Sequence, residues 1–466
     1  MADGWTVVLD VGKTLAKASL WDDTGHCRTH RSRPNRQVSA GGSLTLDAQG
    51  IEQWLEAVLK QFNTLGPVGA IIPVAHGAGA ALIRDGRLQC GPIDYEWRGI
   101  SPDRVDYDRQ RDPFGVTGSP ALPAGLNLGV QLHWLESLHS GTYESSTIVP
   151  WAQYWAWVLS GVAASEMTSL GCHTDLWRPF ERRLSYLAER RGWADRLAPL
   201  RPAGAILGAL TPAWVKRTGL SGRVEVYCGL HDSNAALLSA RNREELQDCD
   251  ATVLSTGTWF VAMRRPKAAA EVPTLPEARD CLVNVDVEGV AIPSSRFMGG
   301  RELEILIGAE PSVRDAQAEQ RLQRQDALAA VERGAMILPS QVPGVGPFPL
   351  AAQRPTGFPA DINATALAHL YAALVADVSL DLIGSRDRLL IDGRFSQAPV
   401  FVQALAALRP DTTIYVSQDE HGVAHGALQL TRRVSPGQAP LQRVSPLPVD
   451  MSEYRARWRE AAGRAG

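Results

Sequence analysis

The chain has 466 residues, of which 45% are hydrophobic and 21% are charged, and its formal net charge at pH 7 is −3. This length predicts two domains, or three, with enough apolar material for a large core. With a pI near 6.4, the chain has no excess of lysine and arginine to neutralise phosphates. The composition therefore argues against a general nucleic-acid surface or an anionic-membrane surface.

The cysteines and the apolar segments indicate where in the cell the protein is expected. Six cysteines are scattered along the chain, with no C-x-x-C pair and no cysteine–histidine cluster at metal spacing. Reduced, buried thiols in a cytoplasmic protein are therefore expected. The first residues lack the basic region of a signal peptide, and no run of 18 apolar residues occurs, so we expect neither a secretory signal nor a membrane span.

Apolar periodicity predicts strands with turns over the first hundred residues and helices after them. A strand at 223–228 then ends in Gly229-Leu230-His231-Asp232, where a helix of small residues begins. The expected strands before it are 5–11, 15–22, 25–31 and 68–75, with a hairpin near 82–90, and the expected helices are 51–63, 126–139 and 150–160.

The second half opens with a β-hairpin at 251–265 and then alternates between helices and strands. Such alternation predicts a largely parallel sheet covered by helices. The Pro/Gly-rich stretches 341–349 and 435–448 indicate loops, and the tail 451–462 has a helical composition that predicts packing back on the body. After the hairpin, the expected helices are 300–308, 363–384, 397–408 and 420–432, and the expected strands are 335–338, 388–392 and 412–417.

Residues 12–14 read Gly-Lys-Thr, the end of a Walker A loop, but Val7 stands where that loop requires a glycine. An alternating segment follows instead of a helix, so the stretch predicts strand, glycine turn and strand, with Asp10 at the end of the first arm. The stretch 251–265 repeats this design around Thr256-Gly257-Thr258. The repeat suggests two related domains, each beginning with the same hairpin.

Both turns have the groups needed to grip a polyphosphate: backbone N–H groups, threonine hydroxyls and lysines. An aspartate beside phosphate repels it unless a divalent cation lies between them, so Asp10 predicts Mg²⁺. The alternative is that both segments are plain hairpin turns, in which Gly and Thr are common. The phosphate-binding candidates are Asp10, Gly12, Lys13, Thr14 and Lys17 in the first turn and Thr256, Gly257 and Thr258 in the second.

Polar residues follow three of the predicted strands. Asp232 is either a general base or a helix N-cap that accepts from backbone N–H groups near Ala235. His231, beside it, is either a partner for a sugar hydroxyl or a pH-sensitive neighbour of Asp232. His76-Gly77 and Tyr95-Glu96 can bind a polyol, with the ring covering an apolar sugar face, although a lone histidine near apolar residues is more often structural.

Four motifs together resemble the FGGY carbohydrate kinases of the sugar kinase/actin/Hsp70 superfamily, from about residue 5 to about residue 432. The resemblance implies an α/β fold of two ribonuclease H-like (actin-like ATPase) domains with a central interdomain cleft. It divides the chain into an N-terminal domain 1–245, a C-terminal domain 246–434 and a tail 435–466. The motifs are DVGKT at 10–14 with Lys17, GLHD at 229–232, STGT at 255–258 and IDGRFSQAPVFVQALA at 391–406.

The resemblance also implies roles for individual residues. Asp10 would be the Mg²⁺-linked aspartate of the first phosphate hairpin, and Asp232 would be the catalytic base, with both counted as metal residues. The remaining implied roles are adenosine binding for Gly299, Gly300, Gly393 and Arg394, and sugar binding for His76, Gly77, Tyr95, Glu96, His231 and Asp232.

Three departures from the family pattern indicate a divergent branch, one resembling rhamnulokinase-, fuculokinase- and xylulokinase-type enzymes. Lys13 stands where the family usually has Thr or Ser. The usual double glycine of the adenosine loop reads Asp392-Gly393, and the usual Arg-Ala-x-x-Glu-Gly helix reads Ala372-Ala373-Leu374-Val375-Ala376-Asp377.

The function predicted on these grounds is transfer of the γ-phosphate of ATP, with Mg²⁺, to a hydroxyl of a ketose such as rhamnulose, fuculose or xylulose. The alternatives are a non-catalytic sugar or nucleotide sensor on the same scaffold, or a kinase for glycerol or another polyol. The expected partners are small molecules, with neither nucleic acid nor membrane among them, and the sequence leaves a monomer or a homodimer open.

Overall fold

In the computed structural model, the described residues are 4–98, 101–267, 272–308, 316–351, 361–417, 421–431 and 439–464. The chain forms two compact units, and each unit is discontinuous in sequence. The division predicted from the sequence, 1–245, 246–434 and 435–466, stays a prediction about folding domains. Unit 1 comprises Met1–Ser239, Val283–Ala291 and His421–Gln438, and unit 2 comprises Ala240–Leu282, Ile292–Glu420 and Ala439–Gly466.

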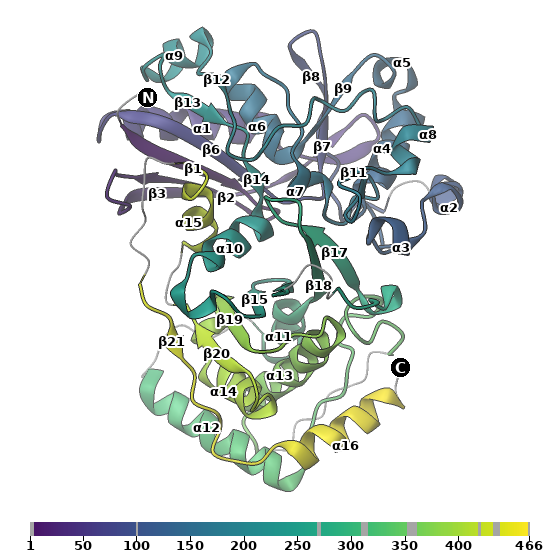
Figure 1. The fold of residues 1–466 in the computed structure, drawn as a ribbon, viewed down its shortest axis with the longest axis vertical. Coiled ribbons are helices and arrows are strands. Elements are labelled where there is room, and N and C mark those ends of the chain that lie inside the picture. The colour runs from purple at the N-terminus through teal and green to yellow at the C-terminus, as the bar shows by residue number, and fades with distance from the viewer. Residues whose placement is uncertain are drawn as a thin grey trace. The chain divides into compact units, whose positions relative to one another are not determined.

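Unit 1 is built on a sheet that has seven strands among the described residues (Figure 1). In order across the sheet the strands are β12 (Ile206–Ala209), β13 (Glu225–Tyr227), β6 (Val68–Ala75), β1 (Trp5–Val11), β2 (Leu15–Trp21) and β3 (Cys27–Pro34), and β14 (Leu230–His231) also pairs with β6. β1 is antiparallel to β2 and parallel to β6, and β6 is parallel to β13. The predicted first hairpin is therefore confirmed.

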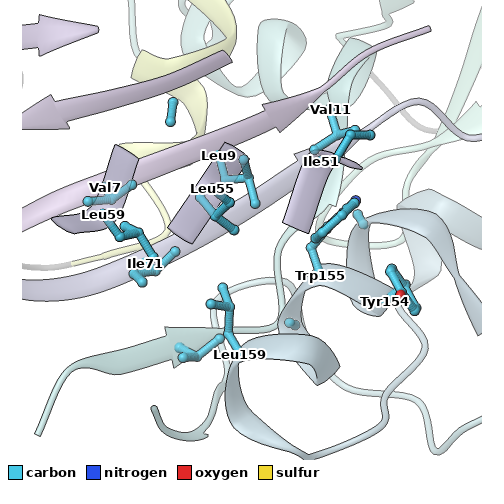
Figure 2. Packing of buried hydrophobic residues seen from close by; sticks show 14 of the residues in the cluster. Val7, Leu9, Val11, Ile51, Leu55, Leu59, Ile71, Tyr154, Trp155 and Leu159 are labelled. Carbon is cyan, nitrogen blue, oxygen red and sulfur yellow. The ribbon is translucent and has the colours of Figure 1, made fainter. Parts of the chain in front are cut away.

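The core of unit 1 lies between this sheet and the helix α1 (Ala48–Asn63). Val7 and Leu9 are on one face of β1, where a strand places alternate residues, and they are completely buried. Ile51 and Leu55, four residues apart on α1, belong to the same buried cluster, and in the view of Figure 2 Leu55 appears next to Leu9 and Ile51 next to Val11. On the helix α6 (Trp151–Ser160), Trp155 belongs to the same cluster, so the predicted aromatic helix serves packing.

Unit 1 also contains short strands and further helices. One helix from late in the chain, α15 (Gly422–Leu428), lies beside β1 and β6 (Figure 1). The other strands are β4 (Gln37–Ala40), β5 (Ser43–Leu46), β7 (Ala80–Arg84), β8 (Arg87–Cys90), β9 (Thr147–Pro150), β10 (Trp177–Arg178) and β11 (Arg183–Leu184), and the other helices are α2 (Ser101–Gln110), α3 (Phe114–Thr117), α4 (Leu128–Leu138), α5 (Ser140–Tyr143), α7 (Met167–Leu170), α8 (Tyr186–Arg190), α9 (Pro212–Thr218) and α10 (Asp232–Arg241).

The second sheet repeats the connectivity of the first. Among the described residues its order is β17 (Cys281–Val285), β18 (Ala291–Phe297), β16 (Phe260–Arg265), β15 (Ala251–Thr256), β19 (Arg388–Gly393), β20 (Thr413–Val416) and β21 (Gln442–Arg443). β15 is antiparallel to β16 and parallel to β19, and β19 is parallel to β20. The strands β15, β16, β19 and β20 thus correspond to β1, β2, β6 and β13, which confirms the internal repeat.

The helices of unit 2 include one that the sequence interpretation missed, α12. Among the described residues, α13 is the one helix long and apolar enough to cross a membrane, and 83% of its apolar window is buried, as in the core helix of a folded domain. The helices are α11 (Gly299–Ile307), α12 (Ala316–Arg333), α13 (Ala364–Leu382), α14 (Pro399–Leu408) and α16 (Ser452–Gly463), with 3₁₀ turns η1 (Glu244–Leu246), η2 (Glu277–Arg279) and η3 (Arg394–Gln397).

The predicted strand at 335–338 is wrong, because these residues form no strand and two of their carbonyl oxygens accept hydrogen bonds from α16. The Tyr454 hydroxyl donates to the carbonyl oxygen of Ala335 at 2.7 Å, and Trp458 Nε1 donates to the carbonyl oxygen of Ile337 at 2.7 Å. The same contacts confirm the predicted packing of the tail. Asp377, where the family's helix motif departs, accepts from Arg455 Nε at 2.6 Å and so helps to hold α16. Two predicted segments, 420–432 and 435–448, lie partly outside the described residues.

Candidate active site

Three parallel strands of unit 1 end side by side. β6 lies between β1 and β14, with Asp10 paired to Val74 and His231 paired to Ala75. Neighbouring strands are about 4.8 Å apart, so residues on β1 and β14 at this level lie about 10 Å apart across β6. The carboxyl end of a parallel sheet is where α/β proteins bind ligands. The sheet therefore brings Asp10, His76 and Asp232 to one edge.

Asp10 is partly buried, and no described residue donates a hydrogen bond to its carboxylate. Loss of hydration and the negative charge of Asp232 raise the pKa of Asp10 to about 7, against a smaller lowering effect of Lys17. Lys17 is the cross-strand partner of Asp10 in the hairpin. The charge of Asp232 therefore acts on Asp10, and Lys17 does not fully offset that effect.

Asp232 is the first residue of α10, and its two carboxylate oxygens have different surroundings. Oδ1 accepts from the backbone N–H of Ser233 at 2.6 Å and lies 3.2 Å from Nε2 of His231. The predicted N-cap contact with the amide near Ala235 is not formed, because Oδ1 bonds the adjacent Ser233 instead. Among the described residues Oδ2 has no hydrogen-bond partner, so it is the oxygen available to a substrate hydroxyl.

His76 is buried beside this carboxylate, and neither ring nitrogen has a hydrogen-bond partner among the described residues. Burial lowers the pKa of His76 to about 4, and the negative charge of Asp232 opposes that shift. His76 is therefore neutral at pH 7. The ring of Tyr95 meets it edge-on, with 5.6 Å between ring centroids. An unpartnered imidazole and a tyrosine ring thus adjoin the predicted base.

Gly77 has no room for a side chain. A Cβ atom there would lie 2.4 Å from Sγ of Cys172 and 3.1 Å from Cδ2 of His231. The glycine therefore allows the Cys172 side chain and the His231 ring to approach the end of β6 closely. This finding gives Gly77 a steric reason to be glycine in addition to its predicted place in the sugar pocket.

Lys13 lies in the turn of the first hairpin, but its side chain turns toward the sugar-side residues. Its Nζ donates to Oδ2 of Asp94, lies 3.5 Å from Oε2 of Glu96 and lies 4.9 Å from the centroid of the Tyr95 ring. Asp94 is completely buried. The sequence interpretation missed Asp94, although its place beside Tyr95-Glu96 at the same strand exit is a signal that could have drawn attention to it.

The first hairpin turn closes on itself. The backbone N–H of Gly12 donates to the carbonyl oxygen of Leu15 at 3.0 Å. The side-chain amide of Asn35 donates to the carbonyl oxygen of Gly12 at 2.6 Å. The Gly12 N–H is therefore occupied within the hairpin. Thr14 and Lys17 are exposed, which leaves them accessible to a ligand.

The predicted nucleotide residues of unit 2 come together at the end of β15 and β19. The Thr256 hydroxyl donates to the carbonyl oxygen of Asp392 at 2.6 Å and accepts from the N–H of Phe395 at 3.0 Å. Its proton is thus used to hold the loop after β19, which includes Gly393 and Arg394. Gly393 has φ +87°, and a Cβ there would lie 2.4 Å from the carbonyl oxygen of Thr256, so only glycine fits this turn.

The start of α11 lies against the second hairpin turn. A Cβ at Gly300 would lie 2.0 Å from the carbonyl oxygen of Gly257, so the helix backbone and the turn approach as closely as glycine permits. Gly257 donates its N–H to the carbonyl oxygen of Trp259 at 3.0 Å, whereas Thr258 is exposed. Gly299 is the first residue of α11, and a helix start presents N–H groups that suit a phosphate.

The described residues contain no group of three or more His, Cys, Asp or Glu side chains that could hold a metal ion. Asp10 and Asp232 nevertheless fit Mg²⁺, because a cation would relieve the repulsion that raises the pKa of Asp10. Mg²⁺ takes oxygen ligands and commonly keeps several waters, so two carboxylates with a substrate phosphate suffice.

The two sheets have the same connectivity, which is that of two ribonuclease H-like, actin-like ATPase domains. A family model described as "Carbohydrate kinase FGGY, C-terminal domain" matches residues 248–440. The structure is similar to that of a carbohydrate kinase from Novosphingobium aromaticivorans, with a TM-score of 0.89 and 49% identity, covering 98% of this chain and 100% of that one.

Two more distant kinases have the same fold. One is xylulose kinase from Rhodospirillum rubrum, with a TM-score of 0.77 and 17% identity, covering 99% of this chain and 98% of that one. The other is gluconate kinase from Lactobacillus acidophilus, with a TM-score of 0.77 and 13% identity, covering 99% of this chain and 97% of that one. A search of curated proteins finds no match. The chain belongs to the FGGY family of carbohydrate kinases and is a phosphotransferase, and sugar kinases of this family use ATP as co-substrate.

Proposed function

We propose that this enzyme transfers the γ-phosphate of ATP to a hydroxyl of a ketose, with Asp232 as the general base. The observation that carries the proposal is the open Oδ2 of Asp232, next to the unpartnered imidazole of His76. A base must lie within hydrogen-bond reach of the proton that it removes, and a carboxylate oxygen without a partner among the described residues, at a polar strand end, meets that requirement. The motif resemblance to ketose kinases supports the substrate class.

In this proposal the acceptor sugar lies against His76, Gly77, Tyr95, Glu96 and His231. The Tyr95 ring covers an apolar face of the sugar, while His76, which has no other partner, donates to one hydroxyl and accepts from another. Oδ2 of Asp232 accepts the proton of the attacking hydroxyl. The backbone N–H of Ser233 donates to Oδ1 of the same carboxylate at 2.6 Å and so helps to fix its orientation, and Nε2 of His231 lies 3.2 Å from Oδ1.

The nucleotide residues take the roles that the resemblance implies. Exposed Thr14 and Lys17 contact the terminal phosphates of ATP, and Gly12 supplies the tight turn that presents them. Mg²⁺, held by Asp10 with Asp232, would neutralise charge on the phosphates. Phosphoryl transfer depends on positioning and charge neutralisation more than on covalent chemistry. The unit 2 residues proposed for nucleotide contacts are Thr256, Gly257, Thr258, Gly299, Gly300, Gly393 and Arg394.

An ADP-release assay tests the proposal, with D-xylulose, L-rhamnulose, L-fuculose, glycerol and D-gluconate as acceptors in the presence of ATP and Mg²⁺. We expect at least one ketose to give the highest kcat/KM, and removal of Mg²⁺ with EDTA to abolish ADP release. Turnover of glycerol in preference to every ketose would reject the ketose assignment. Folded protein that turns over none of the acceptors would favour a sensor. The same proposal places the enzyme in the cytoplasm, where ATP and free sugars are available.

A further inference from the structure

Lys13 departs from the family pattern, and its environment is unusual for a lysine in a phosphate hairpin. Its side chain is only 14% exposed, and its amine is held by Asp94, whose side chain is 0% exposed. Glu96 is the second carboxylate near the amine, at 3.5 Å, and is 61% exposed. The ammonium therefore lies among the predicted sugar-side residues instead of extending from the hairpin into solvent.

Asp94 is rigidly placed. Its backbone N–H donates to the carbonyl oxygen of Leu44 at 2.8 Å, and its Oδ1 accepts from the N–H of Glu96 at 2.8 Å. Oδ2 is then the oxygen that accepts from Lys13. If Lys13 swung away to an ATP phosphate, Asp94 would be left as a buried charge without its partner, which is strongly unfavourable. The pair therefore favours a fixed position of Lys13 on the acceptor side.

The charges around His76 decide what kind of acceptor this pocket can take. The charged groups that act on His76 include Asp232, Lys13 and Asp94, which sum to one negative charge, and Glu96 adds another carboxylate near Lys13. A carboxylate on the acceptor would meet net negative charge and no uncommitted ammonium in this cluster.

We propose that Lys13, Asp94 and Glu96 form a specificity element of the acceptor pocket, in which the two carboxylates outweigh the charge of Lys13 and restrict the acceptor to uncharged polyhydroxy compounds. The ammonium N–H groups of Lys13 that do not bond to Asp94 donate to acceptor hydroxyls. Asp94 acts through Lys13 as a positioning residue. This inference rests on the proposed function, because it needs the acceptor to bind beside His76.

The test uses titration calorimetry and steady-state kinetics on the full-length enzyme. Binding of D-xylulose and D-gluconate is measured directly, and KM is measured separately for the acceptor and for ATP. The variants are Lys13→Met, Asp94→Asn and the double variant Lys13→Met/Asp94→Asn. Lys60→Met serves as the matched control, because Lys60 forms an exposed pair with Glu56 on the surface of α1.

For the wild type we expect the neutral sugar to bind at least tenfold more tightly than D-gluconate. In Asp94→Asn the cluster loses one negative charge and Glu96 is the one carboxylate left to Lys13 in the pair, so the preference for the neutral sugar should fall about tenfold. In Lys13→Met the KM of the acceptor should rise about tenfold while the KM of ATP stays within twofold. The double variant, which leaves no buried unpaired carboxylate, should recover stability and keep the raised acceptor KM, so a poorly folded Lys13→Met does not obscure the result.

Tighter binding of D-gluconate than of D-xylulose by the wild type would overturn the inference. In Lys13→Met or in the double variant, a larger rise in the KM of ATP than in the KM of the acceptor would also overturn the inference. That result would mean that Lys13 binds the phosphates of ATP. These outcomes are separate from failure of the proposed function, which appears as sugar binding without ADP release in the wild type.

Discussion

The backbone N–H of His231 donates to Oγ1 of Thr168 at 3.0 Å, immediately before the proposed base in the chain. The Thr168 hydroxyl in turn donates to Oε2 of the buried Glu166 at 2.6 Å. Because a threonine hydroxyl has a single hydrogen, its donation to Glu166 directs a lone pair at the His231 amide. Thr168 and Glu166 therefore position the end of β14, and the sequence interpretation missed both.

Replacing Thr168 by valine should leave the His231 amide without its partner. We expect Thr168→Val to lower the free energy of unfolding by about 1–3 kcal/mol, the usual cost of a buried unsatisfied group, and to lower kcat more than it changes the KM of ATP. Urea denaturation and steady-state kinetics measure these effects. Thr168→Ser keeps the hydroxyl and should restore both quantities; a serine variant as impaired as the valine variant would contradict the hydrogen-bond explanation.

Replacing Asp232 by asparagine removes the proposed base while keeping its shape. Loss of a general base typically costs about 10²–10⁴ in rate, so kcat for the best acceptor should fall by that factor, while ADP binding measured without Mg²⁺ stays near the wild-type value. Single-turnover kinetics and titration calorimetry make the measurement. Asp23→Asn, in the exposed turn after β2, is the control. Wild-type turnover by Asp232→Asn would show that another group removes the proton.

Replacing Asp10 by asparagine should change how stability depends on pH. The folded-state pKa of about 7 lies above the ordinary value of 3.8. Between these values the folded state holds a proton that the unfolded state has lost, so this stabilising contribution is complete below pH 3.8 and is lost as the pH rises through 7. In urea denaturation without Mg²⁺, Asp10→Asn should therefore gain stability relative to the wild type from pH 4 to pH 8.

The same variant should lose the stabilisation that Mg²⁺ and ADP give the wild type in thermal unfolding. That stabilisation should increase as the pH rises through about 7, because the ionised carboxylate binds the cation. A stability difference between Asp10→Asn and the wild type that does not vary with pH would mean that the pKa of Asp10 is not raised in the folded state.

Adding a methyl group at Gly77 should displace the Cys172 side chain and the His231 ring, whose atoms lie 2.4 Å and 3.1 Å from the position of a Cβ. A displacement of about 1 Å at an active site can cost about 10²-fold in rate, so Gly77→Ala should lose activity to about that extent. Cys172→Ala in the same chain should recover part of it. Gly115→Ala, where a Cβ meets nothing within 4 Å, is the control; equal effects of both alanines would contradict the steric explanation.

Replacing Thr256 by valine should loosen the loop that carries Gly393 and Arg394, because Phe395 N–H and the Asp392 carbonyl oxygen lose their common partner. We expect the KM of ATP to rise several-fold and the dissociation constant of ADP to rise with it, while the acceptor KM stays unchanged. Thr256→Ser should bind ADP like the wild type. An unchanged ADP affinity in Thr256→Val would separate this loop from the nucleotide site.

Several parts of the fold could be predicted from the sequence because their signals are local. The hairpins β1–β2 and β15–β16 have alternating arms and glycine turns, and α1 and α13 have long apolar patterns. The strand expected at 335–338 was wrong because its carbonyl groups bond to side chains of α16, more than a hundred residues later. No pattern within 335–338 carries that information.

The sequence by itself determined the internal repeat, the order of the motifs and the placement of Asp10, His76 and Asp232 at the ends of strands, since each depends on neighbours in the chain. Only the tertiary structure decided where the Lys13 side chain goes. Its partner, Asp94, is 81 positions away, and their meeting depends on long-range packing within unit 1 that brings the β1–β2 turn to the segment after β8. Burial makes that pairing compulsory, because a carboxylate without access to water requires a counter-charge.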